Sequence, residues 1–190
     1  MNIGLFFGSF NPVHHGHLII ANHILNDALV DKIWFVVSPQ NPLKETKSLL
    51  NENQRYYLTD LAVADDDRLR VTDVEFSLER PSYTSVTLAY LTEKYPQHRF
   101  FVIMGGDSFQ NITKWKNYEY ILKNYTIILY NRPGFEISER YAADIIEMKA
   151  PLLEISATAI RKLIQEKKSI RYLMPENVIE EIEKGGYYRK

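Results

Sequence analysis

Short apolar runs and amphipathic segments alternate along the chain. The apolar runs predict buried strands at residues 3–7, 32–37, 69–76, 99–104, 125–130 and 152–155. Segments in which apolar residues recur with a helical period predict helices at residues 16–29, 54–64, 84–95, 156–167 and 175–184, the third of them capped by Ser82 or Thr84. This alternation predicts an α/β fold, a Rossmann-like parallel sheet with helices on both faces.

Turn-forming residues follow several of the predicted strands. Gly8 closes the first strand, Gly105-Gly106 closes the strand at 99–104, and the segment NRPG follows the strand at 125–130. Ligands of parallel α/β sheets bind at the carboxyl ends of the strands, so these turns are expected to share one edge with the binding site. Prolines in SPQNPLKETK, residues 38–47, predict a turn or a lid there.

Composition narrows the possible classes of protein. The 190 residues suit one domain, 1–190, and the formal net charge of −1 provides no basic field that would attract nucleic acid. The chain has no cysteine, which excludes disulfides and thiolate metal sites. No apolar run approaches the roughly 20 residues that cross a membrane. We therefore expect a soluble, cytoplasmic protein without nucleic-acid or membrane partners, and make no prediction of its oligomeric state.

The segment GSFNPVHHGHL, residues 8–18, holds three of the five histidines: His14, His15 and His17. Imidazoles can bind zinc, but a helical zinc pair usually has i, i+4 spacing beside a glutamate, which is not the spacing here. We therefore predict no metal site. A plain strand–helix turn with exposed histidines remains an alternative at this point.

A phosphate site is the third interpretation of this segment. Gly8 and Ser9 allow a close backbone turn after the strand, and Gly16 allows a ligand to approach the start of the helix. Free N–H groups and the positive end of the helix dipole would then face the strand ends, where anions bind. His14 and His17 would add side-chain donors. The segment matches neither G-x-G-x-x-G nor a P-loop.

Two segments carry a resemblance to a known superfamily. GSFNPVHHGH resembles the HxGH signature of the nucleotidyltransferases, and residues 155–161, ISATAIR, resemble their ISxTxxR signature. The residues between and after them are similar to the bacterial nicotinate-nucleotide adenylyltransferases, in the segments PSYT at 81–84, GDS at 106–108, KW at 114–115, RPG at 132–134 and GYYR at 186–189. Asn11 stands where that family often has aspartate, and Lys116 where it often has tyrosine.

The resemblance implies that the fold is of the nucleotidyltransferase type and that the reaction is adenylyl transfer from ATP to nicotinate mononucleotide, in NAD biosynthesis. The products are nicotinate adenine dinucleotide and pyrophosphate. It also implies the site residues. The catalytic residues are His14, His17 and Arg161; the residues that bind ATP are Gly8, Ser9, Phe10, His14, His17, Lys44, Arg132, Ser156, Thr158 and Arg161; and those that bind the mononucleotide are Tyr83, Thr84, Asp107, Trp115 and Lys116. Mg²⁺ is expected to arrive with ATP and not in a protein cage.

Other functions fit parts of the same pattern. Asp107 has a simpler interpretation as the N-cap of a helix that begins at Ser108. A nicotinamide-nucleotide or other small-phosphate nucleotidyltransferase would share both signatures. A nucleotide sensor without turnover would keep the fold, although the presence of His14, His17 and Arg161 argues against it.

Overall fold

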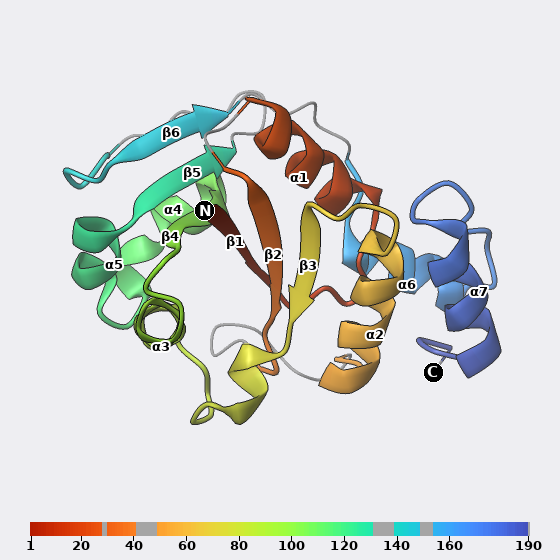
Figure 1. Cartoon of the computed structure of the whole chain (residues 1–190). Coiled ribbons are helices and arrows are strands. Elements are labelled where there is room, and N and C mark those ends of the chain that lie inside the picture. Colours follow the sequence, from red (N-terminus) through yellow and green to blue (C-terminus); the bar gives the residue numbers. More distant parts are fainter. Residues whose placement is uncertain (28–29, 41–48, 131–138, 149–153, 190) are drawn as a thin grey trace.

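A six-stranded sheet forms the centre of the protein (Figure 1). We describe a computed structural model, in which residues 1–27, 30–40, 49–130, 139–148 and 154–189 are described. The strands are β1 (Asn2–Gly8), β2 (Lys32–Val37), β3 (Leu69–Thr72), β4 (Arg99–Gly105), β5 (Thr126–Tyr130) and β6 (Ile145–Met148). Their order is β3-β2-β1-β4-β5-β6, and every neighbouring pair is parallel. The predicted Rossmann-like sheet is confirmed.

Helices cover both faces of this sheet (Figure 1). They are α1 (His15–Asp27), α2 (Glu52–Val63), α3 (Thr84–Lys94), α4 (Gly106–Gln110), α5 (Tyr118–Asn124), α6 (Ala157–Gln165) and α7 (Glu176–Gly185), with 3₁₀ turns η1 (Val74–Ser77) and η2 (Ile112–Lys114). The five predicted helices are confirmed within a few residues. The periodicity did not reveal α4 and α5, which have five and seven residues and are too short to show a helical period, although a helix from Ser108 is part of the alternative interpretation of Asp107.

The core has two parts because successive strand side chains point to opposite faces of the sheet. Phe6, Phe35 and Ile103 belong to the part beneath α1, α2, α6 and α7. Leu5 and Trp34 belong to the other part, beneath α3, α4 and α5. Strands buried on both faces read as continuous apolar runs, which is why they were recognisable in the sequence.

Two predicted strands need correction. The strand predicted at 69–76 ends at Thr72, and Val74–Ser77 forms η1 instead. Of the strand predicted at 152–155, residues 152 and 153 lie outside the described residues, and residues 154 and 155 have no regular structure. The sixth strand is Ile145–Met148, which pairs with β5. This strand has four residues, of which only Met148 is buried, so it does not form the long apolar run by which the other strands were predicted.

The strand order places the crevice of the sheet between β1 and β4. From β1 the chain builds outward through β2 and β3, and it then returns to build β4 on the other side of β1. Ligands bind at the carboxyl ends of the strands at such a reversal. No helix in the described part of the chain is both long and apolar enough to cross a membrane.

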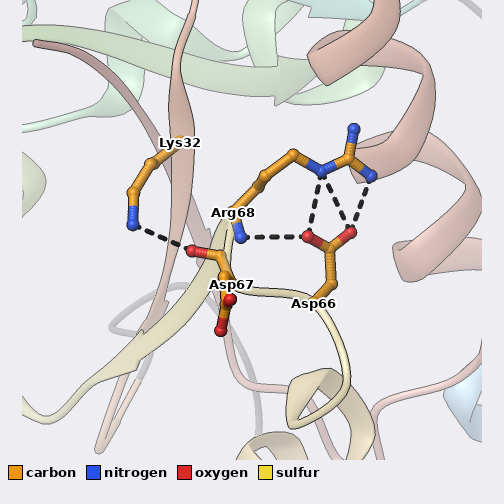
Figure 2. A network of polar contacts seen from close by, with 4 residues as sticks. All are labelled: Lys32, Asp66, Asp67 and Arg68. Carbon is orange, nitrogen blue, oxygen red and sulfur yellow. Dashed lines mark hydrogen bonds and ion pairs between the residues drawn. The ribbon is translucent and has the colours of Figure 1, made fainter.

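The opposite edge of the sheet carries a polar network that lies away from this crevice (Figure 2). Lys32, the first residue of β2, donates from Nζ to the carbonyl oxygen of Asp67 at 2.9 Å. Arg68 binds the Asp66 carboxylate, with Nη2 at 2.7 Å from Oδ2. The bond from Lys32 joins the beginning of β2 to the segment before β3, and the contacts between Arg68 and Asp66 lie within that segment. None of them takes part in the site described next.

Candidate active site

A cavity of about 730 Å³ opens at the carboxyl ends of β1 and β4. Its lining includes Gly8 and Ser9 from the first signature. It also includes every residue predicted to bind the mononucleotide, namely Tyr83, Thr84, Asp107, Trp115 and Lys116. Residues from four separate segments therefore meet around one space, at the position that the strand order favours.

The first signature turns tightly between β1 and α1. Phe10 adopts the left-handed region with φ 43°, which is uncommon for a residue with a side chain. Its ring lies beneath Gly8, where an added Cβ would be 2.8 Å from the ring. The Phe10 ring is also 5.1 Å from that of His17, centroid to centroid, and the residue is 3% exposed. The ring is thus part of the core and supports His17, so a contact of Phe10 with ATP, which stays a prediction, would have to come from its backbone.

His14 and His17 lie against each other, with ring centroids 3.7 Å apart. The backbone N–H of His14 donates to Nδ1 of His17 at 3.2 Å. A neutral imidazole that accepts at Nδ1 carries its proton on Nε2. The signature therefore fixes the tautomer of His17 and leaves Nε2 as the donor nitrogen.

His14 is only 6% exposed. Burial, together with a smaller effect of the nearby charge of His15, lowers the pKa of His14 to about 4. The His14 ring is consequently neutral near pH 7. A Cβ at Gly16 would lie 2.9 Å from Nδ1 of His14 and 3.7 Å from the carbonyl oxygen of Ile155. Glycine at this position therefore leaves room for the buried His14 ring, while the second distance shows that the second signature segment lies next to the first.

The second signature begins α6. Ser156 is its N-cap, and its Oγ accepts from the N–H of Ala159 at 3.1 Å. The hydroxyl proton of Ser156 remains available to an anion. Arg161 donates from Nη1 to the carbonyl oxygen of Asn11 at 2.7 Å and from Nη2 to Oγ1 of Thr158 at 3.3 Å. Arg161 thereby joins the second signature to the first.

Asn11 acts as an acceptor on two sides. Its carbonyl oxygen binds Arg161, and its Oδ1 accepts from the N–H of Leu50 at 3.1 Å. An aspartate could accept the same bond from Leu50. The departure from the family pattern at position 11 therefore leaves this contact possible.

Arg55 is a residue of the site region that the sequence interpretation missed. It is 0% exposed on α2, and its guanidinium donates to the carbonyl oxygens of Ser9 at 2.6 Å, Ser38 at 2.8 Å and Pro39 at 3.0 Å. Its Nε donates to Leu50 at 2.8 Å. Arg55 thus holds the ends of β1 and β2 together beneath the first signature. Arg55 lies on the apolar face of a predicted helix, and this unusual position for a charged residue could have indicated from the sequence that it is buried.

The pyridine end of the predicted site lies at the start of α3. Tyr83 is the N-cap residue and makes no side-chain cap bond, so neither predicted cap is correct. The first turn directs backbone N–H groups and the positive end of the dipole toward the cavity edge. Nζ of Lys116 lies 4.4 Å from the centroid of the Tyr83 ring. The structure therefore brings a lysine cation and a helix N-terminus to the same part of the cavity.

Asp107 lies in the first turn of α4, beside Gly105. The N-cap of that helix is Gly105, which rules out the simpler interpretation of Asp107 as a cap. A Cβ at Gly105 would lie 2.7 Å from Oδ1 of Asp107, so a larger residue there would require the carboxylate to move from its present position. Two predicted residues, Lys44 and Arg132, lie outside the described residues. Among the described residues, no three His, Asp or Glu side chains are grouped so that they could hold a metal ion.

The fold and the two joined signatures define a nucleotidyltransferase class, and comparison with known proteins agrees. A family model described as cytidylyltransferase-like matches residues 5–163. A probable nicotinate-nucleotide adenylyltransferase of Cytophaga hutchinsonii is 49% identical over 99% of this chain and 98% of its own length. One of Bacteroides thetaiotaomicron is 42% identical over 96% and 91%. The chain therefore belongs to the nicotinate-nucleotide adenylyltransferase family.

A solved structure supports the fold independently. The nicotinic acid mononucleotide adenylyltransferase of Plasmodium falciparum, complexed with NaAD, superposes with a TM-score of 0.83. It covers 98% of this chain and 97% of its own, at 20% identity. At that identity the likeness concerns the fold.

Proposed function

We propose that this protein transfers the adenylyl group of ATP to nicotinate mononucleotide, giving nicotinate adenine dinucleotide and pyrophosphate. The names of relatives that match nearly the whole chain support this reaction. The observation that carries the proposal is the bond from Arg161 to Asn11, which joins the two signatures beside a cavity lined by all five residues predicted for the mononucleotide. The whole chain, 1–190, acts as one nucleotidyltransferase domain.

The chemistry needs positioning and charge stabilisation more than it needs a base. A phosphate monoester has a second pKa near 6 and is largely ionised at neutral pH. Its oxygen attacks the α-phosphorus of ATP in line, the bond from that phosphorus to the bridging oxygen breaks, and pyrophosphate leaves with its electron pair. His14, His17 and Arg161 stabilise the charge that develops on the phosphates. His17 donates from Nε2, the nitrogen that its bond from the His14 N–H leaves protonated.

The two substrates occupy different parts of the site. ATP lies along Gly8, Ser9 and the start of α6, where the Ser156 hydroxyl and Thr158 meet its phosphates. Any Mg²⁺ would come with ATP and would neutralise part of the charge of its phosphates, since the described residues offer no cage for it. The mononucleotide lies in the cavity, with its ribose at Asp107 and its ring between Trp115 and the start of α3.

The start of α3 provides the preference for a carboxylate on the ring. Nicotinate presents two acceptors to the N–H groups of the first turn, to Thr84 and to Lys116. A nicotinamide would present an NH₂ donor to these donors and leave buried groups unpaired, at a cost of roughly 1–3 kcal/mol each. We therefore expect about tenfold to hundredfold discrimination for one such mismatch.

The test is pyrophosphate release with ATP and either nicotinate or nicotinamide mononucleotide. The expected result is a higher kcat/KM for nicotinate mononucleotide, and no release when either substrate is left out. A ratio near one, or one that favours the amide, would identify a different nucleotidyltransferase. Binding of ATP without turnover on any mononucleotide would indicate a nucleotide sensor.

A further inference from the structure

Glu75 is a buried carboxylate at the wall of the cavity. It lies in η1, is 2% exposed and is one of the residues that line the cavity. Its Oε2 accepts from the hydroxyl of Ser82 at 2.7 Å, and its Oε1 accepts from the hydroxyl of Thr87 at 2.9 Å. Neither signature includes this residue, and the reaction proposed above does not use it.

Both partners of Glu75 flank the first turn of α3. Ser82 directly precedes the N-cap residue Tyr83, and Thr87 lies one turn into the helix. Oγ1 of Thr87 also lies 3.3 Å from the carbonyl oxygen of Tyr83. Because the hydroxyl has only one proton and Glu75 is nearer, at 2.9 Å, Glu75 is its main acceptor. One carboxylate therefore holds the chain on both sides of Tyr83 and Thr84.

Neutral hydroxyls surround this carboxylate. No ion pair to Glu75 is found among the described residues. Burial raises the pKa of Glu75, against the lowering by its two hydroxyl partners and by the nearby hydroxyl of Ser38, which directly follows β2. Burying a carboxyl group is costly, and a fully bonded buried network fixes one local geometry. The geometry fixed here is that of the turn at the pyridine end of the cavity.

We propose that Glu75 is a positioning residue for the mononucleotide: it aims the first turn of α3 at the pyridine carboxylate through Ser82 and Thr87. The inference rests on the proposed function. Glu75 acts through the turn and does not touch the substrate. A displacement of about 1 Å at such a turn is enough to change a rate by up to about a hundredfold.

The test compares Glu75→Ala with Glu75→Gln in the full chain. Alanine removes both bonds and is expected to raise the KM for nicotinate mononucleotide about tenfold or more, while the KM for ATP changes less than about twofold. Glutamine can accept from one hydroxyl and donate to the other, so it is expected to restore most of the loss. The matched control is Glu79→Gln, because Glu79 is an exposed carboxylate of the same segment. This variant should have the same KM values as the wild type.

A double-mutant cycle tests the route of the effect. Thr87→Val and Ser82→Ala each remove one donor and leave the carboxylate, so they also keep the proposal testable if Glu75→Ala does not fold. Because the residues act as one unit, the effects on the KM of nicotinate mononucleotide should be less than additive in Glu75→Ala/Thr87→Val.

Three results would overturn the positioning role: an unchanged KM for the mononucleotide in folded Glu75→Ala and Thr87→Val, equal losses for both substrates, or equal losses in the Gln and Ala variants. The wild type separates these failures from failure of the proposed function. If the wild type does not turn over nicotinate mononucleotide, the proposed function is wrong; if it does and the variants behave like it, only the role of Glu75 is wrong.

Discussion

Arg161 donates a hydrogen bond of 2.7 Å to the carbonyl oxygen of Asn11, which lies 150 residues earlier in the chain. The bond joins the two signature segments, because each partner belongs to one of them, at the edge of the sheet where we propose that phosphates bind. It also holds a guanidinium group beside the first signature, where the leaving pyrophosphate would lie in the proposed reaction. A guanidinium in that position can bind two phosphate oxygens at once.

Arg161→Ala is therefore expected to lower kcat/KM for ATP, and the reverse reaction with pyrophosphate, by about a hundredfold or more. Both directions depend on the same charged group. The measurement is pyrophosphate release and its reverse, with Lys162→Ala as the matched control, since the Lys162 side chain is 75% exposed on the same helix. If only the KM for the mononucleotide changed in Arg161→Ala, Arg161 would bind the mononucleotide and not ATP.

His17→Ala is expected to lower kcat by about a hundredfold to a thousandfold while the protein stays folded. The reason is the loss of the donor at Nε2, which the bond from the His14 N–H to Nδ1 holds in the protonated form. Turnover under saturating substrates and the urea unfolding midpoint are the two measurements. The matched control is His15→Ala, which removes a neighbouring imidazole that the mechanism does not use and should leave turnover nearly unchanged. Near-normal turnover in His17→Ala would contradict the assignment of His17 as a donor.

The sequence predicted most of the sheet and the two signature segments because both depend on local patterns. Buried parallel strands are continuous apolar runs, and the glycines, histidines and Arg161 lie in short motifs. The sequence could not show that Arg161 would contact Asn11, since that contact depends on packing between distant segments. It could not show the tautomer of His17 either, which follows from a backbone N–H three residues away.

The residues that support the site were harder to predict. Arg55 and Glu75 are charged, and a charged residue is usually exposed. Their partners are backbone carbonyls and hydroxyls in several segments, so no spacing along the chain identifies these contacts, although the position of Arg55 on the apolar face of a helix was a hint that it is buried. Phe10 is the converse case: it lies inside the signature, yet its ring is 3% exposed and packs against the His17 ring from the core. The presence of a residue in a motif therefore did not show whether its side chain faces the site or packs beneath it.

Folding stability should fall in acid because of His14. The pKa of His14 is about 4 in the folded protein, against an ordinary value of 6.5, mainly because the ring is buried. The unfolded chain therefore takes up a proton near pH 6.5 and the folded chain does not, so stability present above that pH is lost as the pH falls toward 4. Between about pH 7 and about pH 5 this amounts to roughly 2 kcal/mol.

Urea unfolding of the wild type and of His14→Gln at these two pH values tests this prediction. The variant has no imidazole at position 14. Between the two pH values its free energy of unfolding should therefore fall by roughly 2 kcal/mol less than that of the wild type. His23→Gln is the control, because the His23 side chain is 35% exposed. Equal pH dependence in the wild type and His14→Gln would show that His14 is accessible to protons in the folded state.

Lys116 should strengthen the preference for nicotinate mononucleotide. Its Nζ lies 4.4 Å from the centroid of the Tyr83 ring, beside the start of α3, in a place where the family often has tyrosine. A cation there attracts the carboxylate of nicotinate and has no such attraction to the neutral amide. Lys116→Gln is therefore expected to lower the ratio of kcat/KM for nicotinate over nicotinamide mononucleotide by about threefold to tenfold.

Lys114→Gln is the matched control for this change. Lys114 also lines the cavity, but its Nζ donates to Oδ1 of Asn111 at 2.7 Å. Because Lys116 is exposed, its effect should shrink as salt is added, whereas a loss caused by a displaced Tyr83 ring would not depend on salt. If Lys116→Gln lowers kcat/KM equally for both mononucleotides at every salt concentration, Lys116 supports the ring and does not select the carboxylate. The preference would then rest on the N–H groups of α3 and on Thr84 alone.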